Sequence, residues 1–339
     1  MGARARVATT PPKGSAVPVG SVGAAGPPRR TASSGPYVPA AGRAGLREAV
    51  TGAARALLSP TGVAGAAVEA TWMALHLGLY PLGLLGSRDS TARDGYGLRD
   101  LTPSQRGLAV QDVEAAHTPI LLVHGMVDNR SIFTVLRRGL VRRGFGRIET
   151  INYPILTGDI RVAAARLGDE VERIAAETGY ERIHVIGHSM GGLIARYYVT
   201  RLGGDARVHT LVTLGTPHHG SYLAYAWGNQ LTRQLRPGSG LLTELAQPVR
   251  DCRTRFIVYS SDLDQVVVPH QNAALRHDDL DVRNIVLHGV GHMSLPITRT
   301  VVKGISEALA HLDTSGATVT PGVSPIVHAP RSRDGSAHA

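Results

Sequence analysis

From Pro119 to about residue 311, short apolar runs rich in β-branched residues alternate with longer amphipathic stretches. Such alternation predicts strands that are followed by helices. The predicted strands are PILLVHG (119–125), RIETINY (147–153), RIHVIGH (182–188), VHTLVTLG (208–215), RFIVYS (255–260) and VRNIVLHG (282–289). The predicted helices span 131–143, 159–178, 190–202, 269–276 and 296–311. Because runs such as ILLV show no polar alternation, we expect a doubly wound, mostly parallel α/β sheet with both faces covered.

Composition separates this region from the two ends of the chain. Residues 1–58 are rich in Ala, Gly, Pro and Ser, as are residues 313–339, and both are predicted to be disordered tails. The first tail is basic: Glu48 is its one acidic residue, against Arg4, Arg6, Lys13, Arg29, Arg30, Arg43, Arg47 and Arg55. No apolar run follows its first charges, so a cleavable signal peptide at residue 1 is not expected. The remaining core, 109–312, is long enough for one domain.

Charge and cysteine usage exclude several classes of function. The formal net charge is +10, but most of the excess lies in the N-terminal tail. The predicted core is therefore only mildly basic, and it lacks the clustered Arg and Lys with interleaved aromatics that nucleic-acid binding requires. Cys252 is the only cysteine, which excludes an intrachain disulfide and a cysteine-based metal site. No P-loop, dinucleotide-binding glycine triplet or HExxH motif is present, so no cofactor and no metal are predicted.

Residues 59–108 contain an apolar segment, Val63 to Gly86, whose only formally charged residue is Glu69. Two interpretations stay open. The segment is long enough to cross a bilayer, with most arginines upstream, which would give a signal anchor and a cell-envelope location. Alternatively, Glu69, Pro81 and several small residues weaken insertion, and the segment forms a helix that packs on the domain or lies at a membrane surface, with a cytoplasmic location as the alternative.

One serine lies between glycines where a predicted strand meets a predicted helix. The strand RIHVIG leads into Gly187-His188-Ser189-Met190-Gly191, and the helix follows at once. A serine at such a tight turn adopts strained backbone angles, and glycines two positions before and after it let the strand and helix approach closely. The free N–H groups at the start of the helix then point toward the hydroxyl, which suits a developing oxyanion. Ser189 is therefore a candidate nucleophile.

Five motifs extend this pattern: LLVHGM, GHSMGG, LGTPHHGS, SSDLDQVVVP and GVGHMSL, in that order. With them, the chain from about Pro119 to His311 resembles an α/β hydrolase of the bacterial lipase/esterase type. The resemblance implies a Ser-acid-His order along the chain. It covers nothing before about Ala109.

The resemblance also indicates the partners of Ser189. His292, in the loop between the last strand and the final helix, is the predicted general base. Asp264 precedes VVVP, where the resembling lipases carry their acid, and is the predicted third member; Asp262 is the alternative. The backbone N–H groups of Met126 and Met190 are the implied oxyanion donors.

The region from about 220 to 250 is the expected cap. Tyr222, Tyr225 and Trp227 fall within six positions in a chain that is only 4% aromatic. They are candidate substrate contacts in an acyl pocket or lid, although the same spacing suits a cap helix packed on the core. The adjacent His218 and His219 are poorly spaced for one metal and are interpreted as loop histidines.

The leading functional hypothesis is a serine hydrolase that cleaves carboxylic esters, with acyl or lipid esters as substrates, through an acyl-enzyme on Ser189. Acyl transfer to an alcohol on the same residues and a non-catalytic, membrane-tethered scaffold are the alternatives. A membrane surface is a further candidate partner. Acyl chain length, the choice among lipase, esterase and phospholipase, and oligomeric state are not determined by these residues.

Overall fold

The computed structural model describes residues 51, 63, 64, 67, 69, 71, 88–90, 113–126, 130–151 and 158–310. All of them belong to one compact unit, Pro36–Ala339. The predicted tails, apart from Thr51, and most of the segment from Val63 to Gly86 lie outside the described residues. Within the described part of the chain, no helix combines the length and the apolar character needed to cross a membrane.

The described strands form a seven-stranded sheet in the order β1-β3-β2-β4-β5-β6-β7. Their bounds are β1 Arg88–Ser90, β2 Ile120–Val123, β3 Ile148–Ile151, β4 Ile183–His188, β5 Val208–Leu214, β6 Arg255–Ser261 and β7 Asp281–Leu287. From β3 to β7 every neighbouring pair is parallel, and β1 is antiparallel to β3. The six predicted strands and the mostly parallel sheet are confirmed. Periodicity did not reveal β1, because RDS is short and polar.

The described helices connect these strands. They are α4 Val113–His117, α5 Thr134–Arg142, α6 Ile160–Thr178, α7 Met190–Arg201, α8 Gln230–Gln234, α9 Gly240–Leu245 and α10 Arg299–Leu309. Helix α6 begins at the predicted place because Asp159 caps it, its side chain accepting a hydrogen bond from Arg161 N. Helices α5 and α10 are preceded by short 3-10 turns, so the predicted helices that begin at 131 and 296 start a few residues later.

The predicted helix over 269–276 is wrong. A single 3-10 turn, His270–Ala273, stands there, and the chain is extended again at Ala274. The side-chain amide of Asn284 on β7 donates to Leu275 O at 2.8 Å and accepts from Leu275 N at 2.9 Å. These bonds satisfy the backbone groups that helix continuation would use, so a tertiary contact overrides the local preference.

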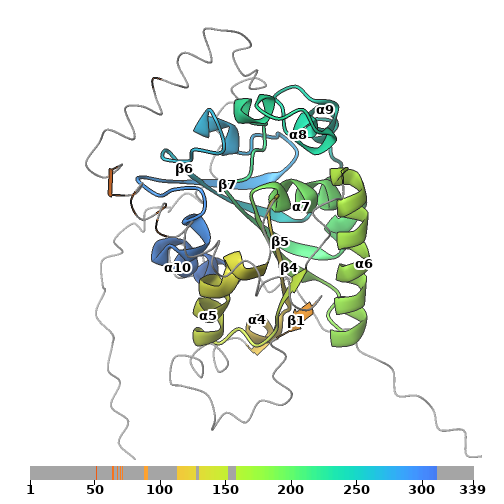
Figure 1. Ribbon diagram of the computed structural model, residues 1–339. Helices are drawn as coiled ribbons and strands as arrows, with labels where there is room; N and C mark the ends of the chain where they lie inside the picture. The colour runs from red at the N-terminus through yellow and green to blue at the C-terminus, as the bar shows by residue number, and fades with distance from the viewer. Residues whose placement is uncertain are drawn as a thin grey trace, which may run out of the picture. The chain divides into compact units, whose positions relative to one another are not determined.

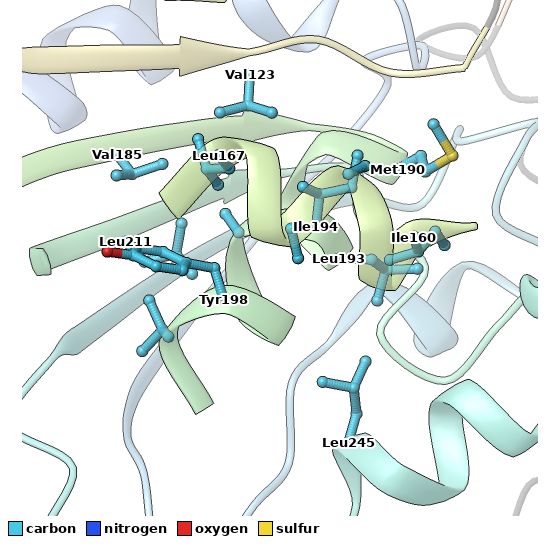
Figure 2. Close-up of a cluster of buried hydrophobic side chains, with 14 of the residues drawn as sticks. Val123, Ile160, Leu167, Val185, Met190, Leu193, Ile194, Tyr198, Leu211 and Leu245 are labelled. Carbon is cyan, nitrogen blue, oxygen red and sulfur yellow. The ribbon is translucent and has the colours of Figure 1, made fainter. Parts of the chain in front are cut away.

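Two layers of helices cover the sheet, with α5 and α10 on one face and α6 on the other (Figure 1). Alternate residues of each strand point to opposite faces. Accordingly, Leu121 and Val123 pack with α6 and α7, whereas Ile120 and Leu122 pack with α5 and α10. Figure 2 shows the first cluster, where strand side chains such as Val185 meet helix side chains. Burial on both faces explains why these strands are apolar throughout.

Residues between β5 and β6 form the region expected as a cap. It contains a 3-10 turn at Tyr222–Tyr225 and the helices α8 and α9. Its apolar side chains join the core cluster on the α7 side. The fully buried Arg196 of α7 donates hydrogen bonds to the carbonyl oxygens of His218, before the 3-10 turn, and Leu245, the last residue of α9. The guanidinium thereby anchors the region to the helix that follows Ser189.

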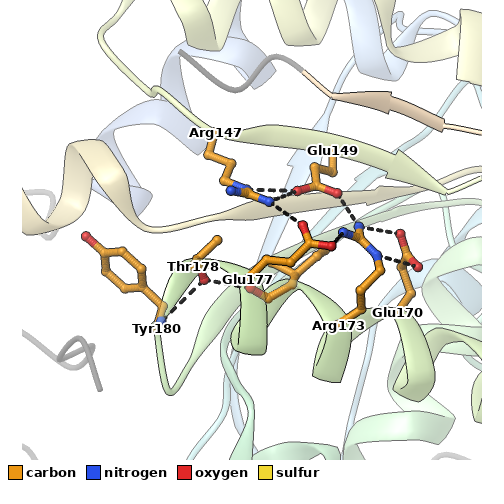
Figure 3. Close-up of polar contacts among 8 residues, drawn as sticks. Arg147, Glu149, Glu170, Arg173, Glu177, Thr178 and Tyr180 are labelled. Carbon is orange, nitrogen blue, oxygen red and sulfur yellow. Dashed lines mark hydrogen bonds and ion pairs between the residues drawn. The ribbon is translucent and has the colours of Figure 1, made fainter. Parts of the chain in front are cut away.

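A charged network links α6 to β3 (Figure 3). The carboxylate of Glu149, 7% exposed, pairs with Arg147 at 2.8 Å and with Arg173. Arg173 also pairs with Glu170 at 2.7 Å and with Glu177 at 2.6 Å. The Arg173 guanidinium beside it lowers the pKa of Glu177. Because Glu149 is largely removed from water, loss of one partner leaves its charge poorly compensated.

We expect Arg173→Met to destabilise the domain by about 1–2 kcal/mol, since it breaks a network around a buried carboxylate. Arg166→Met is the matched control, because Arg166 is exposed on the same helix. Urea denaturation at pH 7 measures both. Arg173 lowers the pKa of Glu177, so this part of the deficit should shrink as the pH falls from the ordinary pKa of a glutamate, about 4.3, through the lowered pKa of Glu177. Equal stability of the two variants at pH 7 would contradict the prediction.

Candidate active site

The turn between β4 and α7 holds Ser189 in a strained conformation. β4 ends at His188, α7 begins at Met190, and Ser189 between them has φ 53° and ψ −126°. A non-glycine residue with positive φ costs about 1–3 kcal/mol unless its surroundings hold it there. Here the backbone N–H of Ser189 donates to Leu214 O on the neighbouring strand at 2.8 Å. The serine therefore stands at the edge of the sheet where the parallel strands end.

Close backbone contacts explain the glycines around this turn. A Cβ atom on Gly191 would overlap the carbonyl oxygen of Val123, and one on Gly187 would overlap the backbone of Gly192. Gly125, after β2, is also close, because a Cβ there would lie 2.9 Å from Ser189 Cβ. Strand, turn and helix can approach this closely only without side chains at these positions. The predicted reason for the glycine spacing agrees with the geometry.

His292 and Asp264 lie side by side and buried. The Nδ1–H of His292 donates to Asp264 Oδ2 at 2.8 Å, and the two side chains are 2% and 0% exposed. The other carboxylate oxygen accepts from the backbone N–H groups of Val266 at 2.9 Å and Val267 at 2.8 Å. Three donors thus bind the Asp264 carboxylate and hold its orientation. With Nδ1–H committed to it, the neutral His292 ring carries its lone pair on Nε2.

Asp262, the alternative acid, faces different partners. Its carboxylate accepts from His288 Nδ1 at 2.7 Å and from Gly289 N at 2.9 Å. Burial raises the pKa of Asp262, but the hydrogen bonds from His288 and Gly289 outweigh this effect, and the net pKa is lowered. The structure therefore brings Asp264, and not Asp262, to His292. Asp262 instead ties the end of β6 to the beginning of the loop that carries His292.

A pocket brings the predicted residues together. Its lining includes Gly125, Met126, His188, Ser189, Met190 and His292. The rest of the wall is mostly apolar and comes largely from the cap: Pro217, Ser221, Leu223, Ala224, Trp227, Thr232, Leu235, Val266 and Met293. Ser189 and His292 therefore open into one cavity that is bounded by apolar side chains.

Of the three aromatic side chains predicted to contact substrate, one lines the pocket and two do not. Trp227 lines the pocket and is 53% exposed. Tyr222 and Tyr225 are not among its lining residues; their rings stack with centroids 6.2 Å apart, and Arg236 lies over the ring of Tyr225. His218 and His219 also lie outside the lining. Burial lowers the pKa of His218 well below its ordinary value, and its Nε2 lies 3.0 Å from Thr213 Oγ1.

Several contacts at the site were not predicted from the sequence. No role was predicted for His188, yet its Nε2 donates to the carbonyl oxygen of His292 at 3.2 Å. The hydroxyl of Ser221 donates to Val266 O at 2.6 Å and accepts from Val268 N, so it ties the start of the cap to the Asp264 loop. Glu69 contacts the His292 loop from far upstream. A lone carboxylate in an apolar segment was the available signal for Glu69.

Comparisons with known proteins identify the fold. Residues 118–236 match the family model described as alpha/beta hydrolase fold. The mature form of Bacillus licheniformis lipase BlEst2 superposes on 66% of this chain and 97% of its own, with 16% identity and a TM-score of 0.51. Aspergillus fumigatus lipase B covers 58% of this chain and 54% of its own, with 16% identity and a TM-score of 0.51. The described domain therefore has the α/β-hydrolase fold.

Relatives found by sequence are lipases. A triacylglycerol lipase of Pseudarthrobacter phenanthrenivorans is 41% identical over 118 residues, which are 32% of this chain. A triacylglycerol lipase of Burkholderia plantarii is 27% identical over 132 residues, which are 37% of this chain. Each match spans only 36% of the relative's length. The fold is thus shared with α/β hydrolases, and the partial sequence matches fall on proteins named triacylglycerol lipase.

We expect Gly191→Ala to yield little folded protein, because the added methyl group collides with the carbonyl of Val123 at the center of the sheet. Gly228→Ala, in the cap, should fold like the unchanged protein, since nothing lies within 4 Å of the position its Cβ would occupy. Soluble yield and circular dichroism of the two variants measure this difference. Normal folding of Gly191→Ala would show that the domain can fold without this close approach of α7 to β2.

Proposed function

We propose that the protein hydrolyses carboxylic esters through an acyl-enzyme on Ser189, with Asp264 and His292 as the other members of the triad. The observation that carries this proposal is the buried 2.8 Å hydrogen bond from His292 to Asp264, beside a pocket that His292 shares with Ser189. A serine hydroxyl is a weak nucleophile until an oriented base accepts its proton. The Asp264 carboxylate supplies that orientation.

In the first half of the reaction, Ser189 Oγ bonds to the ester carbonyl carbon and its proton passes to Nε2 of His292. The imidazolium then donates this proton to the alkoxy leaving group as the carbon–oxygen bond of the ester breaks, and an acyl-Ser189 ester remains. A water molecule repeats the sequence, and Ser189 and a carboxylic acid are released. The anionic Asp264, held by two backbone N–H groups, stabilises the imidazolium in both halves.

The tetrahedral intermediate needs two donors for its oxyanion. The proposed donors are the backbone N–H groups of Met190, the first residue of α7, and Met126, which follows Gly125. Both residues line the pocket with Ser189. The positive end of the α7 dipole also favours negative charge at this point.

The proposed substrates are acyl or lipid esters, because most of the pocket wall away from the triad is apolar. Three lining side chains are also open to solvent: Leu223, Trp227 and Val266 are 36%, 53% and 39% exposed. Exposed apolar side chains around a pocket favour contact with an aggregated lipid or a membrane surface. The relatives found by sequence are named triacylglycerol lipases, which agrees with this substrate class. Contacts of Tyr222 and Tyr225 with substrate remain a prediction.

We expect a fluorophosphonate probe to label the purified protein and p-nitrophenyl esters to be hydrolysed, with both activities lost in Ser189→Ala. Removal of a nucleophile typically lowers turnover by about 10⁴-fold or more. Gel fluorescence and a series of esters of increasing acyl length measure the two effects. A folded protein that neither reacts with the probe nor turns over any ester would contradict the proposal.

Asp264→Asn should lower kcat by about 10²- to 10⁴-fold, because an amide neither stabilises the imidazolium nor holds the required tautomer. Asp262→Asn is the matched control on the same loop and should retain most of the activity, since Asp262 contacts His288 rather than His292. Steady-state kinetics on one soluble ester compares them. The reverse order of effects would make Asp262 the acid.

A further inference from the structure

The loop that carries His292 has a partner outside the region that matches the family model. Glu69 lies in a helical stretch of the apolar segment Val63 to Gly86, called the N-terminal segment below, and is only 5% exposed. One oxygen of its carboxylate accepts a hydrogen bond from Met293 N at 2.6 Å. The other accepts from Ser294 N at 2.9 Å and from Ser294 Oγ at 2.6 Å. More than 220 residues separate the two sides of this contact in the sequence.

These donors are the two residues that directly follow His292. Ser294 precedes the 3-10 turn Leu295–Ile297, and its own side chain makes no capping bond. Met293 N and Ser294 N lie before this turn, in the segment that joins it to His292. Ser294 N also donates to Gly291 O at 3.2 Å, so it shares its hydrogen between the Glu69 carboxylate and the backbone of the loop. Glu69 therefore ties the segment between His292 and the turn to another part of the chain.

The backbone before His292 is shaped to admit this carboxylate. A Cβ atom on Gly291 would overlap the Glu69 carboxyl group. The φ of Gly291 is not in the left-handed region, so space rather than backbone angle accounts for glycine here. Glu69 thus lies against the peptide before His292 and binds the two N–H groups after it.

Three contacts from different elements now act on one residue. Asp264 orients the imidazole ring, His188 binds the carbonyl oxygen of His292, and Glu69 binds the following N–H groups. Asp264 and His188 lie in the part of the chain that resembles α/β hydrolases. Glu69 does not line the pocket, so it has no direct contact with substrate. Its contribution to the reaction passes through the backbone of the loop.

We propose that Glu69 is a positioning residue for catalysis: its carboxylate fixes the His292 loop, so that the N-terminal segment completes the active site. This inference rests on the proposed hydrolase function. A displacement of His292 Nε2 by a fraction of an ångström lowers the rate of proton transfer while substrate binding is unaffected. The loss should therefore fall on kcat and not on KM.

The first test is Glu69→Gln, which keeps the shape of the side chain. The amide oxygen still accepts one hydrogen bond, but the NH₂ group opposes the remaining backbone donor. We expect kcat to fall at least tenfold, KM to stay within twofold, and the rate of fluorophosphonate labelling to fall in parallel with kcat. Thr71→Ala is the control, because the exposed Thr71 donates to Ala67 O of its own helical stretch. The kcat, KM and labelling rate of Thr71→Ala should equal those of the unchanged protein.

The second test uses the space at Gly291. Gly291→Ala should lower kcat at least tenfold in the otherwise unchanged protein, because the methyl group expels the Glu69 carboxylate. In the Glu69→Ala background the same substitution should cost less than threefold, since the obstructing group is gone. Equal costs in both backgrounds would overturn the proposal, because the effect of Gly291 would then not pass through Glu69.

A third measurement needs no activity. The Met293 amide donates to Glu69, so its hydrogen exchange should be at least tenfold faster in Glu69→Ala, which removes the acceptor, and unchanged in Thr71→Ala. Unchanged exchange at Met293, or a kcat within twofold of the unchanged protein, would overturn the proposal. If the unchanged protein shows no Ser189-dependent turnover, the proposed function fails together with the catalytic role of Glu69, and the exchange data still show whether Glu69 holds the loop.

Discussion

Burial of the parallel sheet on both faces is the constraint on which the other features depend. Alternate strand residues pack into two separate clusters, as Ile120 and Leu121 illustrate, and each cluster needs its own layer of helices. This arrangement brings the ends of β4 and β6 and the loop after β7 to the same edge. It also presses α7 against β2, so that only glycine fits at position 191. The strained angles of Ser189 persist because this packing leaves the turn no alternative.

Hydrogen bonds of buried polar groups then determine the local geometry of the site. The Asp264 carboxylate accepts two backbone N–H groups and the His292 ring, and the hydroxyl of Ser221 ties the same loop to the cap. Arg196 holds the other end of the cap through a carbonyl oxygen. Because an unsatisfied buried group costs about 1–3 kcal/mol, such contacts hold loops that the apolar core alone would leave free to move. Glu69 extends the same principle to the loop after β7.

Most of the fold could be predicted because periodicity and apolar runs report burial directly. The six parallel strands follow from that pattern, and the turn at Ser189 follows from its glycines. The helix expected over 269–276 is absent, because the amide of Asn284 binds the backbone of Leu275 across the fold. No local pattern contains that information. The choice between Asp262 and Asp264 was open in the residues alone, and the directions of their hydrogen bonds separate them.

The sequence by itself determined the order of strands and helices, the position of the nucleophile turn and the candidates for its partners, because these properties depend on near neighbours along the chain. Only the tertiary structure decided which carboxylate meets His292, which aromatic side chain lines the pocket, and what Glu69 contacts. Glu69 stood out in the sequence only as a charge that disfavours membrane insertion. Its partners lie more than 220 residues away, and contacts at such separations arise from the packing of the whole domain rather than from any local preference.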